Sequence, residues 1–243
     1  MARTFEALEK SRIQTHKKTK GKHLRFSDLP IETRHQFEKL KSHIILGNSS
    51  KRIKSILFSS YNHGEGTSTI VANFAESLAQ DRKYRILTVD ANTRTPSLHG
   101  IAGYDNPAKK LFFSDILTQQ FSTLALPNPS LSSNMSLIPS GRIVYHPSQV
   151  FDHTQFVNFI DCTTNLFDLV IFDSSPIGKY YDSIVLASYV DGVILVVEAE
   201  KTSSNELKRV KEMLVDKNIP ILGVILNRRK FRIPNFVFNS FLK

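Results

Sequence analysis

The 243-residue chain has a single cysteine, Cys162, and no long run of apolar residues. One cysteine excludes an intrachain disulfide and a cysteine metal cluster. No segment approaches the roughly 20 apolar residues that a membrane-spanning helix needs, and the N-terminus lacks the apolar core of a signal peptide. We therefore expect a cytoplasmic protein that contacts a membrane only peripherally or through a partner.

Basic residues outnumber acidic ones at both ends of the chain. Residues 1–54 carry a net charge of +9 and residues 228–243 carry +5, which leaves −4 for the segment between them. Basic ends of this kind suit an anionic surface, such as membrane headgroups, nucleic acid or an acidic partner. Solvated tails have the same composition, so both interpretations stay open.

Composition divides the chain into three parts. Residues 1–50 form a basic arm followed by a helix, which we expect from Glu32 to Ile45. An apolar stripe on that helix predicts packing on the core of residues 51–228, with a subunit contact as the alternative. Residues 229–243 mix cations with phenylalanines and either lie at a membrane interface or fold back on the domain.

Short apolar runs alternate with helical patterns through residues 51–228. We expect strands over residues 55–59, 85–89, 135–138, 167–172, 192–197 and 221–226. Several of these runs are continuously apolar, which is typical of parallel strands covered on both faces. The order of elements predicts an α/β fold with a doubly wound, mostly parallel sheet between helix layers.

The turn after the first strand is the most informative stretch. It contains Gly64, Glu65, Gly66, Thr67, Ser68 and Thr69 and runs directly into a helix. Free amides and the helix dipole make such a turn an anion site. A phosphate-binding loop reads G-x-x-x-x-G-K-[ST], but here threonine stands at the lysine position and Tyr61 at the first glycine. The backbone cradle can survive this change, whereas the lysine that reaches the β- and γ-phosphates is missing.

Two aspartates end strands of the predicted sheet. Asp90 follows the second strand and Asp173 the fourth, so both should meet the loop at the ligand-binding edge of the sheet. Hydroxyl and carboxylate oxygens suit Mg²⁺, which makes Ser68, Asp90 and Asp173 candidate metal ligands. A strand-ending aspartate can also simply cap the next helix.

A dinucleotide-binding turn is a weaker alternative. Gly64 and Gly66 followed by Asp90 fit that pattern superficially, but Thr69 occupies its third glycine position. The Asp173 strand end also has no role in such a site. We therefore favour a nucleotide phosphate over a dinucleotide.

With these motifs the chain resembles the bacterial tyrosine kinases of capsule and exopolysaccharide synthesis, which are P-loop NTPases related to partition and division-site ATPases. Residues 64–69 match the Gly-Glu-Gly-Lys-Ser-Thr motif of that family except at Thr67. Residues 89–99 resemble its Asp-x-Asp-x-Arg motif, with Asn92 at the second aspartate. Residues 167–176 match its third motif.

The resemblance implies ATP or ADP and Mg²⁺ as ligands. It implies catalytic roles for Asp90 and Asp173, nucleotide contacts from residues 64–69 and Arg94, and an adenine contact from Asn227. The implied partner is a membrane polysaccharide co-polymerase or export protein. A homo-oligomer is open, and nucleic acid is not expected.

The chain also departs from the family pattern. Thr67 and Asn92 each remove a charged group, and no tyrosine follows Tyr189, where the family carries a tyrosine cluster. Because preorganised charge is usually the largest catalytic contribution, we expect nucleotide binding with slow or no turnover. The alternatives are an active kinase or ATPase that uses Arg94 or Lys179 as a substitute cation, and a partition-type ATPase that binds DNA or membrane.

Overall fold

The structure is a computed structural model that describes residues 26–46, 52–101, 111–118, 126–127, 134–144 and 153–229. Two predictions fall on residues outside these ranges. They are the basic arm before residue 26 and the aromatic tail after residue 229.

Six parallel strands form one sheet, as the sequence predicts. Their order is β3-β2-β4-β1-β5-β6, and every neighbouring pair is parallel. The strands are β1 (Ser55–Ser60), β2 (Ile86–Asp90), β3 (Met135–Ile138), β4 (Leu169–Asp173), β5 (Gly192–Glu198) and β6 (Ile221–Asn227). The predicted fourth strand begins two residues too early, because Phe167 and Asp168 precede β4.

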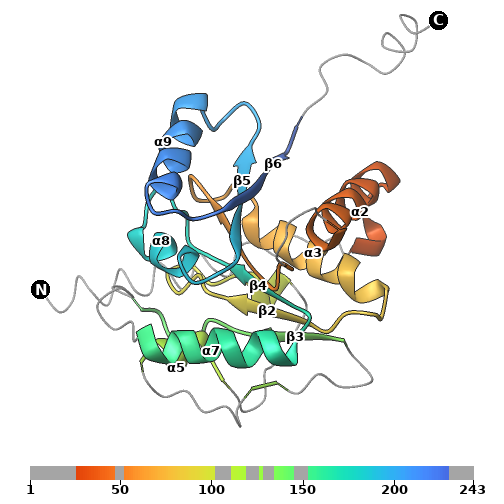
Figure 1. Cartoon of the computed structure of the whole chain (residues 1–243). Helices are drawn as coiled ribbons and strands as arrows, with labels where there is room; N and C mark the ends of the chain where they lie inside the picture. The colour runs from red at the N-terminus through yellow and green to blue at the C-terminus, as the bar shows by residue number, and fades with distance from the viewer. Residues whose placement is uncertain are drawn as a thin grey trace, which may run out of the picture.

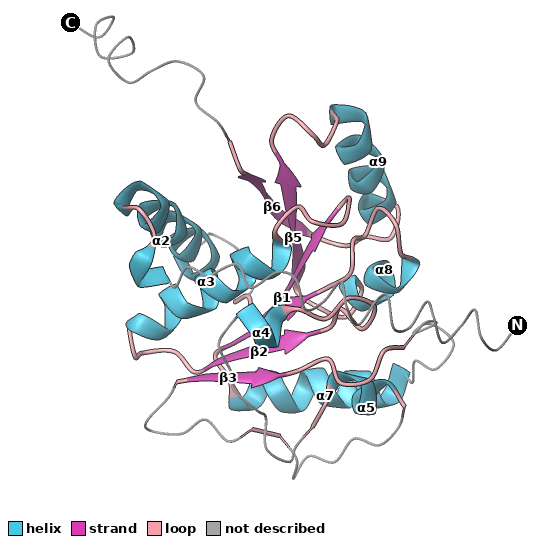
Figure 2. Cartoon of the chain, turned by 180° about the vertical axis from the view of Figure 1, so that it is seen from behind, coloured by secondary structure: helices cyan, strands magenta, loops and turns pink. Residues whose placement is uncertain are grey.

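Helices cover both faces of this sheet (Figures 1 and 2). One layer consists of α2 (Ile31–Leu46), α3 (Thr67–Gln80) and α4 (Leu98–Ile101), with the short 3₁₀ helix η1 (Phe26–Asp28) beside α3. The opposite layer consists of α5 (Phe113–Leu117), α7 (His153–Leu166), α8 (Tyr181–Ala187) and α9 (Ser204–Val215). The doubly wound arrangement is therefore confirmed.

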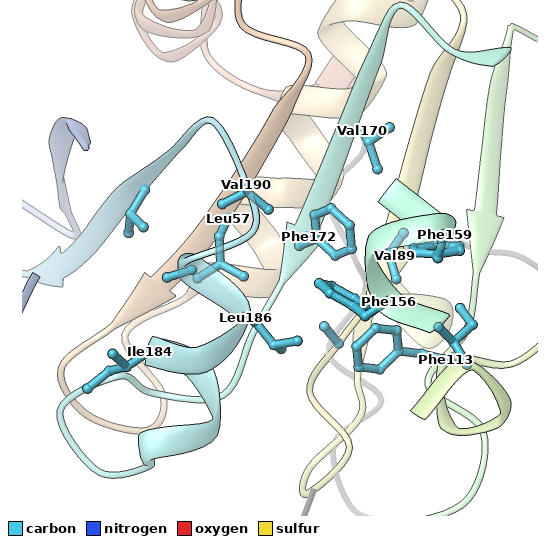
Figure 3. Close-up of a cluster of buried hydrophobic side chains, with 14 of the residues drawn as sticks. Leu57, Val89, Phe113, Phe156, Phe159, Val170, Phe172, Ile184, Leu186 and Val190 are labelled. Atoms are coloured by element: carbon cyan, nitrogen blue, oxygen red, sulfur yellow. The ribbon is translucent and has the colours of Figure 1, made fainter. Parts of the chain in front are cut away.

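The two faces of each strand contribute side chains to two separate hydrophobic clusters. In β1, Leu57 belongs to the cluster under α5, α7, α8 and α9, whereas Phe58 belongs to the cluster under α2 and α3. Figure 3 shows Phe156 and Phe159 of α7 beside Phe172 of β4. The ring centroids of these two residues lie 6.1 and 6.3 Å from that of Phe172. Burial on both faces explains why the strands read as continuous apolar runs.

The N-terminal helix packs on the domain core, as its apolar stripe predicts. Phe37 and Ile44 of α2 are buried in the cluster that contains Phe74 of α3. At the surface of the same contact, the Lys41 ammonium lies 3.0 Å from the Asp81 carboxylate. None of the described helices combines the length and the apolar character that crossing a bilayer would require.

Candidate functional site

Parallel strands bring three chain segments together at the carboxyl edge of the sheet. Asp90 and Asp173 are register partners at the ends of β2 and β4, and β1 lies next to β4. A cavity of about 260 Å³ opens beside these strand ends. Its lining contains the whole loop from His63 to Thr69 together with Ser60, Asn92, Thr95, Ser97, Ile101, Ser174, Pro176 and Arg228. The loop and the segments that follow both strands therefore line one cavity at this edge, whereas the buried Asp90 and Asp173 are not part of its wall.

Two glycines shape the loop that leads into α3. Gly64 has φ +79° and Gly66 has φ +93°, in the left-handed region that L side chains rarely adopt. A Cβ on Gly66 would also collide with the side-chain amide of Asn227. Because Gly66 stands at the N-cap and has no side chain, the first-turn amides of α3 remain available to an anion at the cavity.

The Glu65 side chain organises the loop from within. Its carboxylate is buried and accepts hydrogen bonds from the amides of Tyr61 (2.9 Å) and Asn62 (3.1 Å) and from the Thr202 hydroxyl. The side chain thus binds the protein's own donors. Any contribution of Glu65 to an anion would come from its backbone.

This arrangement predicts a measurable cost for Glu65→Ala. The substitution leaves two loop amides without their acceptor, so we expect the free energy of unfolding to fall by about 1–3 kcal/mol. Urea denaturation measures this change. Glu212→Ala, at an exposed position on α9, is the control and should change stability by less than about 0.5 kcal/mol. Equal values for the two variants would contradict the role assigned to Glu65.

The two aspartates differ sharply in how they are satisfied. Asp90 accepts hydrogen bonds from the amides of Asn92 (3.2 Å) and Leu98 (3.1 Å). Asp173 is fully buried, and neither of its carboxylate oxygens accepts a geometrically sound hydrogen bond from any described residue. Burial, and then the charge of Asp90, raise the pKa of Asp173 well above its ordinary value, while the Ser68 hydroxyl opposes the shift only in part.

A divalent cation fits this pair of carboxylates. The unsatisfied oxygens of Asp173 and the hydroxyl of Ser68 are hard ligands of the kind that Mg²⁺ prefers. The described residues contain no cluster of three or more histidines, cysteines or acids that could hold a metal. Mg²⁺ binds through one or two carboxylates and keeps water or phosphate oxygens as its other ligands. Ser68, Asp90 and Asp173 would hold the ion, which would offset their negative charge.

Asn92 occupies the position of the second motif aspartate and is tied into a polar network. Its Oδ1 accepts hydrogen bonds from the Ser175 hydroxyl (2.8 Å) and the Thr95 amide (3.1 Å). Its Nδ2 donates to the Thr95 hydroxyl (3.1 Å). The residue therefore connects the segment after β2 to the segment after β4 with a neutral group at the cavity wall.

Several residues predicted to contact a nucleotide are engaged elsewhere. The Arg94 guanidinium lies 2.6 Å from the Asp182 carboxylate and 4.3 Å from the ring centroid of Tyr180. Lys179, the other suggested substitute cation, lies 5.1 Å from the ring centroid of Tyr61. Neither cation belongs to the residues that line the cavity.

Asn227 supports the loop from the end of β6. Its Nδ2 donates to the carbonyl of Glu65 (2.8 Å), and its Oδ1 accepts from the amide of Arg228 (2.9 Å). Asn227 is not among the residues that line the cavity, so its predicted adenine contact remains a proposal.

Sequence reasoning did not assign several residues of the cavity wall to the site, and two of them, His63 and Arg228, carry basic side chains. His63 stands immediately before Gly64, and its Nε2 lies 2.9 Å from the Tyr180 hydroxyl. Arg228 directly follows Asn227, and that adjacency was the signal that could have identified it. Thr67 lines the cavity without closing it, and Tyr61 is not part of the wall.

These features define a P-loop NTPase fold with a phosphate-type loop after its first strand and carboxylates after two others. A family model described as an AAA domain matches residues 53–218, and the chain belongs to that family.

Named relatives support the resemblance seen in the motifs. Tyrosine-protein kinase CpsD of Streptococcus agalactiae is 29% identical over 74% of this chain and 77% of its own length. The crystal structure of the chimerical protein CapA2B2 has a TM-score of 0.72 and is 27% identical, covering 84% of this chain and 88% of that one. The predicted similarity to bacterial tyrosine kinases is confirmed.

A more distant structure shares the fold alone. The septum site-determining protein MinD of Pyrococcus horikoshii, complexed with Mg-ADP, is 20% identical with a TM-score of 0.60. The match covers 77% of this chain and 76% of that one. The relation to division-site ATPases is thus a relation of architecture.

Proposed function

We propose that this protein binds ATP or ADP with Mg²⁺ and regulates exopolysaccharide synthesis or export as a kinase-like protein with impaired or absent kinase activity. The observation that carries the proposal is an open cavity lined by the loop from His63 to Thr69, in which Thr67 stands at the lysine position. The cradle favours binding, and the missing lysine disfavours turnover.

Binding rests on groups that the threonine does not alter. The loop from Gly64 to Thr69 lines the cavity, and the first turn of α3 points its amides there. The unsatisfied carboxylate of Asp173 supplies a site for the cation that accompanies a di- or triphosphate. These three features require only main-chain groups and the Asp173 carboxylate.

Turnover depends on charged groups that the loop and the second motif of this chain lack. Phosphoryl transfer places developing negative charge on the transferred group and the leaving oxygen, and positioned cations stabilise it. Loss of one such group typically costs on the order of 10² to 10³ in rate. Thr67 and Asn92 each replace a charged residue of the motif with a neutral one. A pseudokinase follows from this chemistry.

The cellular role extends from the named relatives, which are tyrosine-protein kinases. We propose a cytoplasmic protein that meets a membrane polysaccharide co-polymerase or export protein. The basic residues of segments 1–54 and 228–243 suit peripheral contact with the anionic membrane beside that partner.

Incubation with γ-labelled ATP and Mg²⁺ tests the catalytic half of the proposal. We expect the protein to retain nucleotide, to release ADP slowly and to form little phosphotyrosine, on itself or on an added tyrosine-containing substrate. Robust phosphotyrosine that disappears in Asp173→Ala would show an active kinase and overturn the assignment as a pseudokinase. Failure to retain any nucleotide would overturn the binding role as well.

A further inference from the structure

The cavity wall contains one permanently charged cation among the described residues, and it is Arg228. The remaining lining residues are neutral or acidic, apart from His63. A cavity for a di- or triphosphate needs positive charge, because the ligand brings several negative charges into it. Arg228 therefore stands where the anion would otherwise meet only amides and hydroxyls.

Arg228 also holds an unfavourable backbone conformation. Its φ is +55°, in the left-handed region where glycine is favoured over other residues. The amide of Arg228 donates a hydrogen bond to Oδ1 of Asn227. The Nδ2 of the same asparagine donates to the loop carbonyl of Glu65. Backbone strain of this kind is concentrated at functional sites, and here it occurs at a residue of the cavity wall.

The ion pair that holds Arg228 can be shared with a ligand. Its Nη1 lies 3.1 Å from an oxygen of Glu198, and the Nζ of Lys201 lies 2.9 Å from the same oxygen. A hydrogen bond from Lys201 is the largest cause that lowers the pKa of Glu198, with Arg228 contributing less. Glu198 consequently keeps a partner when the guanidinium turns to another anion.

We propose that Arg228 binds the phosphates of the nucleotide and supplies the positive charge that Thr67 does not. The proposal rests on the proposed function, because it assigns a residue to the same site. A guanidinium suits the task, since its planar fork can donate two parallel hydrogen bonds to one phosphate. It would strengthen binding from the β6 side of the cavity, whereas a loop lysine would act from the start of α3.

Calorimetric titration with ADP, inorganic pyrophosphate and adenosine tests this assignment. Arg228→Gln is expected to weaken ADP and pyrophosphate about 10-fold and to leave adenosine unchanged. Lys201→Gln is the matched control, because it removes the same charge and the same Glu198 partner at a similarly exposed side chain outside the cavity. We expect its affinities to stay within about two-fold of the unaltered protein.

Glu198→Gln provides an independent measurement. It frees Arg228 from its present partner, so ADP and pyrophosphate should bind about two- to five-fold more tightly. Unchanged or weaker binding in this variant, or unchanged affinities in a folded Arg228→Gln protein, would overturn the assignment of Arg228 alone. Absence of ADP and pyrophosphate binding in the unaltered protein would overturn the proposed function, and this inference with it.

Discussion

Thr67→Lys combined with Asn92→Asp is expected to raise ATP turnover by about 10² to 10³ over the unaltered protein. The two substitutions restore the charged groups of the loop and of the second motif. Thr67 lines the cavity at the first position of α3, so a lysine there can extend toward a bound phosphate. Steady-state release of ADP in the presence of Mg²⁺ measures the effect.

The surrounding structure can accept both changes. Oδ1 of Asn92 only accepts hydrogen bonds, from Ser175 and Thr95, and a carboxylate oxygen can accept the same bonds. The substitution removes the hydrogen bond that the Asn92 Nδ2 donates to the Thr95 hydroxyl. Addition of Asp173→Asn to the double variant is the control and should abolish the gain. A double variant that binds ATP and still turns it over no faster would show that charge at these positions is not what limits the rate.

Asp173→Asn alone should stabilise the ligand-free protein and strongly reduce the effect of Mg²⁺ on its affinity for ADP. The native carboxylate is fully buried beside Asp90, and only the Ser68 hydroxyl favours its charged form, so its negative charge is costly. We expect a gain of at least about 1 kcal/mol, which corresponds to about 2–4 °C in melting temperature for a chain of this length. The increase in ADP affinity that Mg²⁺ produces should fall at least ten-fold in the same variant.

The pH dependence of that stabilisation has a defined sign. Burial and Asp90 raise the pKa of Asp173 in the folded state above its unfolded value of about 3.9. Below the unfolded pKa both states are protonated, so the native group costs nothing. The cost grows as pH rises through the folded pKa. The advantage of Asp173→Asn should therefore be present at neutral pH and vanish toward about pH 4.

Asp168→Asn is the control, and its effect on the stability of the protein should have the opposite sign. Burial alone would raise the pKa of Asp168, but hydrogen bonds from the backbone and side chain of Arg85 outweigh it and lower the pKa. Its stabilising contribution is present above the unfolded pKa and is lost as pH falls through the folded one. Asp168→Asn should therefore destabilise the protein at neutral pH. Parallel pH profiles for the two variants would contradict the electrostatic account of Asp173.

The fold was predictable because its central strands, β1, β2, β4 and β5, are buried on both faces. Runs such as the one around Ile171 in β4 are continuously apolar, and this pattern belongs to parallel sheets with two helix layers. Glycines at positions 64 and 66 revealed the turn, since their left-handed backbone leaves few other residue choices. Asp90 and Asp173 could be placed at one edge because parallel strands end on the same side.

The side-chain partners inside the site could not be read in the same way. Arg94 matches a motif position, yet its contacts with Asp182 and Tyr180 depend on a loop and a helix 86 or more positions further along the chain. The presence of Arg228 in the cavity wall depends on the register of β6 and on a left-handed residue that no local pattern announces. Motifs locate strand ends and loops, whereas ion pairs follow from tertiary packing.

Titration of the purified protein with ADP, with and without Mg²⁺, tests the central claim most directly. That claim is that the loop amides at the carboxyl edge of the sheet, aided by the buried aspartates, hold a nucleotide although Thr67 replaces a lysine. The account predicts saturable binding in the micromolar range that tightens when Mg²⁺ is added. No heat of binding at millimolar ADP in either condition would contradict it.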